Sequence, residues 1–280
     1  MNLKDSCVLV TGGAGGVGVA TARRLLAAGC TVMLWDLSKA GLERAASLLA
    51  GEGHPEARVF TDVVNITDSA AVRDAVERSR SAMGRIDVLV NNAGHLTPGG
   101  FLDQPAEVWQ STVDVNLSGL INVTRAVLPH LYAQNHGQIV NISSASSFVG
   151  VSGLAVYSAT KWAVWGLTEA LRHEAVDDRR AVRFSSVHPN YISRGMFEGA
   201  RIRGLGGLLF PRLPDHDVVA KAIVNQAIRR GRRVVRRPRS LRLAILLRGL
   251  LPEAFFAWAA RRLQIHTSMQ SWTGSAGGSR

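Results

Sequence analysis

Tyr157 and Lys161 are the two side chains in this sequence best suited to acid–base chemistry. Residues four apart on a helix lie on one face, one turn apart. A free phenol has a pKa of about 10, and a nearby ammonium favours the phenolate. At roughly 4 Å and an effective dielectric near 20, one positive charge is worth about 4 kcal/mol, or about three pKa units. We therefore expect Lys161 to lower the pKa of Tyr157 into the range useful for a general acid–base. The alternative is an exposed helical pair without a chemical role.

A glycine-rich loop near the N-terminus has the pattern of a phosphate site. An apolar run at 6–11 leads into Gly-Gly-Ala-Gly-Gly-Val-Gly at 12–18, and a helical pattern follows at 19–28. Glycine allows a tight turn and the close approach of a ligand to the backbone, and the amides at a helix N-terminus suit a pyrophosphate. The alternative is a plain turn. The residues predicted to bind phosphate are Gly12, Gly15, Gly16, Val17 and Gly18.

A carboxylate ends the second apolar run and bears on the choice of cofactor. Asp36 closes the run 31–36 and lies 18 residues after Gly18. An acid near that distance typically accepts hydrogen bonds from the adenosine ribose hydroxyls and repels a 2′-phosphate. The sequence therefore favours NAD over NADP, with Asp36 and Leu37 at the adenosine end. The alternative is that Asp36 merely caps the following helix.

The elements that would position these residues alternate along the chain. Further strands are predicted at 58–64, 86–90, 137–143, 182–187 and 234–235, and helices at 39–51, 68–82, 105–132, 155–176 and 215–230. Such alternation predicts an α/β fold, a Rossmann-type doubly wound parallel sheet of about seven strands with helices on both faces. We expect one domain at 1–240 with a substrate lid at about 194–214. A basic extension at 241–280 would pack on it with helices near 240–250 and 253–263 and a disordered end at 274–280.

Several motifs occur in one order along residues 5–194. They are Thr11-Gly12-x3-Gly16-x-Gly18, Asn91-Asn92-Ala93-Gly94, Asn116, Ser144, Tyr157-x3-Lys161 and Pro189-x3-Ser193. In these motifs the chain resembles the short-chain dehydrogenase/reductase family, of the single-domain type. The resemblance implies an oxidoreductase in which the nicotinamide carries the hydride and the protein supplies orientation and proton transfer.

The resemblance also implies a role for each motif residue. Tyr157 would exchange the hydroxyl proton, Ser144 would hydrogen-bond the substrate, Lys161 would bond the nicotinamide ribose and Asn116 would hold a relay water. For the cofactor, Asp62 and Val63 would flank the adenine, Asn92, Ala93 and Gly94 would line the adenosine path, and Pro189, Ile192 and Ser193 would cover the nicotinamide. The chain departs from the family pattern at Asn190, usually glycine, and at Ser193, usually threonine. Asn190 is a further candidate to contact the substrate.

The segments 32–36, 188–192 and 250–252, together with Ser268-Met269, resemble more weakly the branch that contains retinol and 17β-hydroxysteroid dehydrogenases. This implies a lipophilic alcohol or ketone as substrate, and the apolar segment 196–213 agrees, unless it is ordinary core packing. The family usually pairs through two long helices, here 105–132 and 155–176, which implies a homodimer or homotetramer. The other hypotheses are a catalytically silent dinucleotide-binding sensor and a peripheral membrane protein that uses its basic C-terminal region.

Composition limits the remaining choices. The apolar content is 46%, and the two cysteines, Cys7 and Cys30, lie in apolar runs, which suits a reducing cytoplasm. No signal peptide, bilayer-spanning run or metal-ligand spacing is visible. Of the net charge of +12, residues 1–193 contribute −1 and residues 194–280 contribute +13. The basic third would pack on the enzyme, contact an anionic membrane surface, or bind nucleic acid, which is disfavoured because no aromatic platform accompanies the arginines.

Overall fold

The computed structural model describes residues 1–269 and 272–273, so the predicted disordered end at 274–280 lies outside the described residues. Seven parallel strands form one sheet in the order β3-β2-β1-β4-β5-β6-β7. Their bounds are β1 (Cys7–Thr11), β2 (Thr31–Asp36), β3 (Val59–Val63), β4 (Val88–Asn91), β5 (Gly137–Ile142), β6 (Val182–Pro189) and β7 (Val234–Arg237). The order reverses between β1 and β4, and ligands of such sheets bind beyond the carboxyl ends of the strands at that reversal. The predicted doubly wound parallel sheet is confirmed.

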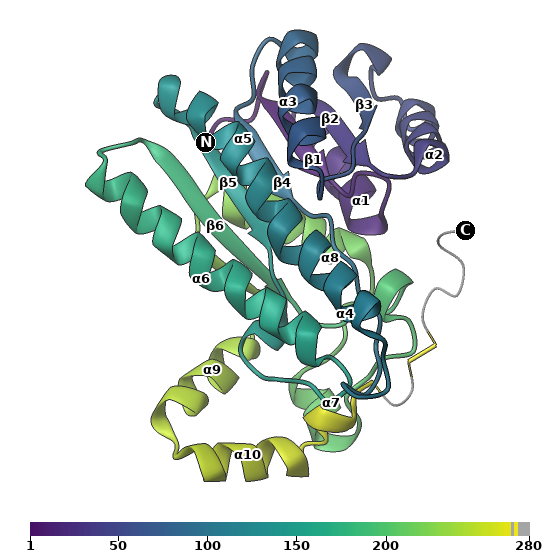
Figure 1. The fold of residues 1–280 in the computed structure, drawn as a ribbon, viewed down its shortest axis with the longest axis vertical. Helices are drawn as coiled ribbons and strands as arrows, with labels where there is room; N and C mark the ends of the chain where they lie inside the picture. Colours follow the sequence, from purple (N-terminus) through teal and green to yellow (C-terminus); the bar gives the residue numbers. More distant parts are fainter. Residues whose placement is uncertain (270–271, 274–280) are drawn as a thin grey trace.

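Helices cover both faces of the sheet (Figure 1). Val8 and Val10 of β1 point into one apolar core, while Leu9 between them points into the other, as the two-residue period of a strand requires. The first core packs against α1 (Gly16–Leu26), α2 (Lys39–Gly51) and α8 (His216–Ala222), which continues as a π-helix at Ile223–Arg229. The second packs against α3 (Ser69–Met83), α5 (Leu120–Ala133) and α6 (Ala155–Asp177).

The long helix predicted at 105–132 contains a wide turn. α4 (Ala106–Val113) passes into a π-helix at Asp114–Gly119 before α5 begins. Gly119 packs closely there, because an added Cβ would lie 2.7 Å from Cγ1 of Ile66. Single π turns inside helices are frequent at functional sites, and Asn116 lies in this one.

The last third of the chain forms short helices at one end of the molecule, where Figure 1 places α9 and α10 beside α7. Their bounds are α7 (Gly204–Leu209), α9 (Leu241–Leu250) and α10 (Glu253–Arg262), and 3-10 turns occupy Glu56–Arg58, Ala145–Ser147, Gly195–Phe197 and Ile265–Thr267. The guanidinium of Arg248 in α9 lies 4.8 Å from the ring centre of Trp162 in α6 and donates to the carbonyl of Phe148. Among the described residues, no helix combines the length and the apolar character needed to cross a membrane.

Candidate active site

A groove of about 1150 Å³ runs over the carboxyl ends of β1 and β4. The glycine loop forms its floor, and Gly12 adopts a φ of +64°, a conformation that other residues rarely take. Gly18 does not line the groove. A Cβ at Gly18 would lie 2.2 Å from the carbonyl oxygen of Gly12, so this glycine lets α1 pack against the loop. The N-terminal amides of α1 therefore reach the groove, which can receive the phosphates of a dinucleotide.

Two polar side chains fix the loop in place. Thr11 Oγ1 accepts hydrogen bonds of 3.0 Å from the amides of Asn92 and Ala93. Asn92 Nδ2 donates in return to the carbonyls of Thr11 and Gly12, both at 3.0 Å. The side-chain amide of Asn92 thus hydrogen-bonds the backbone of the loop. Thr11 belongs to the quoted motif, but only the fold reveals this role.

Asp36 lies at the end of β2 and borders the groove. Its carboxylate accepts from the amide of Ala14 in the glycine loop and from that of Ser38, each at 3.1 Å. The N-cap of α2 is Ser38, whose Oγ accepts from Gly41. The capping role considered for Asp36 therefore belongs to Ser38, and the Asp36 carboxylate borders the groove beside Leu37.

The structure places Asp62 and Val63 outside this groove. Both belong to β3, where Asp62 pairs with Arg78 of α3 at 2.8 Å and Val63 is 49% exposed. A ligand site at the carboxyl edge is lined by residues that follow a strand rather than by those within it. The residues after β3 that border the same end of the groove as Asp36 are Val64, Asn65 and Ile66, with Val115 from the π-helix. The predicted strand end at 64 was the signal that could have located them.

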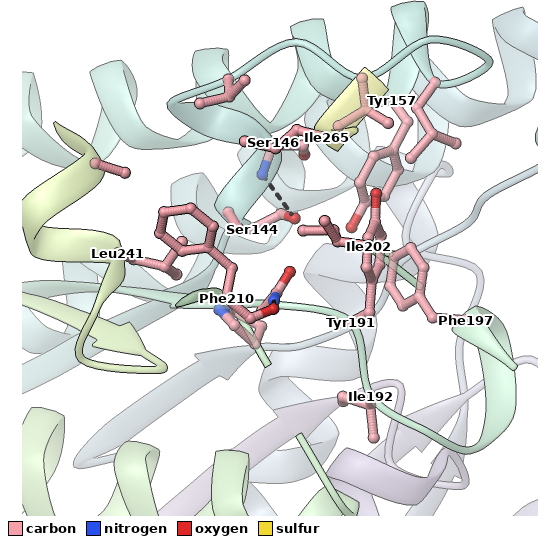
Figure 2. Close-up of a pocket in the computed structure, with 17 residues that line it drawn as sticks. Ser144, Ser146, Tyr157, Tyr191, Ile192, Phe197, Ile202, Phe210, Leu241 and Ile265 are labelled. Carbon is pink, nitrogen blue, oxygen red and sulfur yellow. Dashed lines mark hydrogen bonds between the residues drawn. The ribbon is translucent and has the colours of Figure 1, made fainter. Parts of the chain in front are cut away.

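Ser144, Tyr157 and Lys161 converge where the groove meets a second cavity. Tyr157 borders both spaces, and Figure 2 shows it reaching into the cavity from α6 with Ser144 nearby. Ser144 hydrogen-bonds the phenol and also accepts from the amide of Ser146 at 3.2 Å. Lys161 Nζ lies 5.6 Å from the Tyr157 ring centre and donates to the carbonyl of Ile142 at 3.1 Å. The predicted pair is therefore buried and shared by two spaces, rather than exposed on a helix.

The pKa of Tyr157 shifts in the direction opposite to the predicted one. Burial raises it well above the usual range, and the hydrogen bond from Ser144 offsets only part of the rise. Burial also lowers the pKa of Lys161 to about 8. Desolvation thus disfavours both charged forms, and at neutral pH it outweighs the attraction between ammonium and phenolate. The expectation that Lys161 makes Tyr157 acidic is wrong for this structure.

The pKa of Lys161 leads to a prediction about stability. Below pH 8 the folded protein must carry a buried ammonium, whereas between pH 8 and about 10 the unfolded chain holds a proton that the folded chain has released. Lys161→Met should therefore raise the free energy of unfolding by about 3 kcal/mol at pH 7, and this advantage should shrink as pH rises to 10. Denaturant unfolding at pH 7, 8.5 and 10 measures the difference.

Lys39→Met in α2 is the matched control, because Lys39 is exposed. Its stability difference from the unaltered protein should stay constant across that pH range. A constant difference for Lys161→Met as well would contradict the lowered pKa.

Asn116 is held by main-chain atoms from the residue after Gly94. Its Oδ1 accepts from the amide of His95 at 2.7 Å, and its Nδ2 donates to the His95 carbonyl at 2.8 Å. A Cβ built on Gly94 would lie 3.4 Å from Asn116 Oδ1 and 3.8 Å from Lys161 Nζ, so these side chains converge over that glycine. Asn116 and Lys161 therefore approach the same glycine, and the relay water that the resemblance implies for Asn116 stays a prediction.

The second cavity has a volume of about 680 Å³ and is mostly apolar. Figure 2 shows side chains from the lid and from the C-terminal extension converging on Ser144 and Tyr157. The apolar side chains that line it are Val149, Val151, Leu154, Ile192, Phe197, Ile202, Phe210, Leu241, Ala244 and Ile265. An apolar lining with a few polar groups at one end suits a lipophilic molecule.

Asn190 and Ser193, the two departures from the family pattern, both hydrogen-bond the backbone of the lid. Asn190 borders the cavity, but its Nδ2 donates to the carbonyls of Phe210 and Pro211 at 3.0 and 3.1 Å. Ser193 donates from its amide and its Oγ to the carbonyl of Leu213, at 2.9 and 3.1 Å. Ser193 does not border the groove as Pro189 and Ile192 do, so its predicted contact with a carboxamide has no counterpart in this geometry.

A buried histidine behind Ser144 was not predicted from the sequence as a site residue. His188 is fully buried, and its ring nitrogens lie 2.8 Å from Ser147 Oγ and 2.9 Å from Ser186 Oγ. Ser147 Oγ donates to the Ser144 carbonyl at 2.6 Å, so the network fixes the backbone of Ser144. Arg194 and His216 also border the groove. Neither belongs to a quoted motif, although Arg194 directly follows one.

The fold and the site match known proteins. The model of the short chain dehydrogenase family matches residues 6–203. The 3-oxoacyl-(acyl-carrier-protein) reductase FabG of Thermotoga maritima is 35% identical over 228 residues, which cover 80% of this chain and 91% of the relative. Human epidermal retinol dehydrogenase 2 is 31% identical over 252 residues, which cover 90% of this chain and 80% of the relative.

Among solved structures, a short chain dehydrogenase/reductase from Burkholderia phymatum, in complex with NAD, has the same fold. Its TM-score is 0.77 at 22% identity, over 89% of this chain and 95% of that one. The chain belongs to the short-chain dehydrogenase/reductase family, and its dinucleotide-binding fold is that of a nicotinamide-dependent oxidoreductase.

Proposed function

We propose that this protein is an NAD-dependent oxidoreductase that interconverts a lipophilic alcohol and the corresponding aldehyde or ketone. The observation that carries the proposal is the position of Tyr157 on the boundary between the dinucleotide groove and the apolar cavity. A substrate in the cavity and a nicotinamide in the groove would meet at that phenol. A group at such a junction can exchange a proton with a bound hydroxyl or carbonyl.

The groove fits NAD in shape and in charge. The phosphates would lie on the glycine loop at Gly12, Gly15, Gly16 and Val17, which offers backbone amides, and the His216 ring packs against Gly16. The Asp36 carboxylate would accept from the adenosine ribose hydroxyls and would repel a 2′-phosphate. At the adenine end, Val64, Asn65 and Ile66 take the place proposed for Asp62 and Val63. Ala93, Gly94, Pro189 and Ile192 complete the walls.

The chemistry of the proposed step divides between cofactor and protein. Bound NAD would supply the hydride acceptor for the alcohol carbon. In the reduction, the neutral Tyr157 phenol gives its proton to the carbonyl oxygen; in the oxidation, the phenol first releases its own proton to solvent, and the phenolate then takes the proton of the alcohol. Ser144 hydrogen-bonds the reacting oxygen in both directions. Lys161, whose pKa lies near 8, is charged in most molecules at neutral pH and stabilises the phenolate. Asn116 would keep Lys161 connected to solvent.

The substrate class rests on the cavity lining and agrees with the names of relatives. A retinol dehydrogenase takes a lipophilic alcohol by name, and a 3-oxoacyl reductase takes an acyl carbonyl compound. The lid contributes Phe197, Ile202 and Phe210, so the proposed lid at about 194–214 is also part of the cavity wall. The C-terminal extension adds Leu241, Ala244 and Ile265.

We also propose that the protein pairs through α5 and α6. Both helices expose large apolar side chains, namely Ile121 in α5 and Trp162 and Val176 in α6.

Cys7 and Cys30 are buried and unpaired, as suits a reducing compartment.

A substrate panel tests the proposal. The purified protein should oxidise long-chain, retinoid or steroid alcohols with NAD at a kcat/KM far above that for short alcohols. Ala244→Phe would fill part of the cavity and should raise the KM for the long substrates by roughly tenfold or more, with little effect on short ones. Steady-state kinetics measures both.

Ala257→Phe is the matched control, since Ala257 lies on the exposed side of α10. It should leave the KM for every substrate unchanged. Turnover confined to short polar alcohols, or an Ala244→Phe variant with an unchanged chain-length preference, would contradict the proposed substrate class.

A further inference from the structure

Three neighbouring helices expose apolar side chains at one end of the molecule (Figure 1). In α9 the exposed leucines recur at i, i+3, i+4 and i+7, which is one face of a helix. They are Leu243, Leu246, Leu247 and Leu250, with exposed fractions of 55, 58, 39 and 71%. α10 adds Phe255 and Trp258, and α7 adds Leu205, Leu208 and Leu209, all at least 46% exposed. We call these nine side chains the apolar end surface.

α9 is apolar on its outer side as well as on its inner side, which is unusual for a helix on the surface of a water-soluble protein. Its inner side carries Leu241 and Ala244, which line the substrate cavity, and Arg248. A surface helix normally turns its charged side chains outward and its leucines inward. Here a guanidinium is turned toward Phe148 and Trp162, while four leucines face outward. An exposed apolar area of this kind marks an interaction site.

The three helices contact one another. Arg248 of α9 lies 5.7 Å from the ring centre of Phe256 in α10. A Cβ on Gly206 of α7 would lie 2.0 Å from the carbonyl oxygen of Leu263, directly after α10. The exposed apolar side chains are therefore carried by adjoining helices at the same end of the molecule.

Positive charge borders the apolar end surface. Six exposed arginines lie on or next to the three helices, and the segments 199–212 and 238–269 contain one acidic residue, Glu253. These arginines are Arg201, Arg203, Arg239, Arg242, Arg261 and Arg262. Within residues 1–269 and 272–273, none of them forms an ion pair. A second copy docked by a two-fold axis would bring the same arginines together, so the charge favours a different and anionic partner.

We propose that the apolar end surface docks on a phospholipid bilayer that carries anionic headgroups. Leucine and aromatic side chains enter the boundary between headgroups and acyl chains, while the arginines bond the phosphates above them. The same α9 has its inner side on the substrate cavity, so docking brings the cavity to within about one helix diameter, roughly 10 Å, of the lipid. The proposal concerns a surface and stands whether or not the proposed function is correct.

Vesicle sedimentation of the full chain tests the proposal. The protein should sediment with vesicles of phosphatidylcholine and phosphatidylserine, much less with phosphatidylcholine alone, and less at high salt. Leu246→Gln together with Leu250→Gln should lower the partition coefficient by roughly tenfold or more, because both leucines would lie in the lipid. Arg261→Gln with Arg262→Gln should lower binding only to the anionic vesicles.

Leu48→Gln provides the matched control for Leu246→Gln. Leu48 lies in α2, away from these helices in Figure 1, and is 49% exposed against 58% for Leu246. The control should bind vesicles as the unaltered protein does. Equal losses in both variants, or no sedimentation of the unaltered protein with anionic vesicles, would overturn the proposal.

Sedimentation velocity in the absence of lipid tests the alternative that a second copy of the chain covers the apolar end surface. The unaltered protein and the double-leucine variant should have the same oligomeric state. If the double-leucine variant alone dissociates, the apolar end surface is an interface between copies of the chain and the bilayer proposal is wrong.

Discussion

Tyr157→Phe should lower kcat by roughly 10²- to 10⁴-fold, the range that general acid–base catalysis contributes. The substitution removes a hydroxyl from the boundary between the groove and the apolar cavity and leaves the ring in place. Binding of NAD should change little, because the glycine loop and Asp36 are untouched. Stopped-flow or steady-state turnover gives kcat, and quenching of tryptophan fluorescence gives the affinity for NAD.

Tyr191→Phe is the matched control for Tyr157→Phe. Tyr191 lines the same cavity, and both tyrosine rings contact Phe197, with centre distances of 5.9 Å for Tyr157 and 5.3 Å for Tyr191. The Tyr191 hydroxyl bonds Ser268 Oγ at 2.8 Å, so its loss should cost severalfold at most. Similar losses in the two variants would mean that packing, rather than proton transfer, explains the effect, and an active Tyr157→Phe enzyme would refute the assigned acid–base role.

Asp36→Asn should reverse much of the preference for NAD. A hydrogen bond to a charged acceptor is worth about 1.5–3 kcal/mol, so loss of the charge should raise the KM for NAD by roughly 10- to 150-fold. The KM for NADP should fall, because the carboxylate no longer repels its 2′-phosphate. The measurement is the ratio of kcat/KM for the two cofactors in the unaltered and altered proteins.

Asparagine is preferred to alanine here because Asp36 accepts from Ala14 and Ser38. The two amides donate to different oxygens of Asp36, so asparagine keeps one of these bonds, whereas alanine would lose both and loosen the glycine loop further. Asp62→Asn is the control, since that carboxylate pairs with Arg78 outside the groove and should not affect either cofactor. Tighter binding of NADP than of NAD by the unaltered protein would contradict the proposed role of Asp36.

The sequence predicted the elements well where a short-range pattern determines them. The apolar run 31–36, the glycine loop and the alternation of strands with helices led to the correct sheet, because strand and helix periods are local properties. β7 was predicted at 234–235 and spans Val234–Arg237. The helix at 105–132 was predicted as continuous, because no residue type is specific for a π turn. In the structure Gly119 of this π turn packs against Ile66.

The candidate site was harder to predict where three-dimensional surroundings decide the outcome. Spacing alone indicated that Lys161 would make Tyr157 acidic, but the cost of burying a charge depends on the lid and on the cavity walls. The family resemblance implied Asp62 beside the adenine, whereas Asp62 lies within β3 and the residues that border the groove after this strand begin at Val64 and include Asn65. The network of His188, Ser147 and Ser144 joins residues up to 44 positions apart, a contact that no local pattern encodes.

The buried histidine has a consequence for the way this enzyme senses acidity. Burial lowers the pKa of His188 to about 3, so the imidazole stays neutral from mildly acid to alkaline solution. The serine that faces the substrate is therefore held the same way throughout that span. Variation of the catalytic rate with acidity should therefore originate in groups other than this imidazole, first among them the phenol and the amine at the junction of the groove and the cavity.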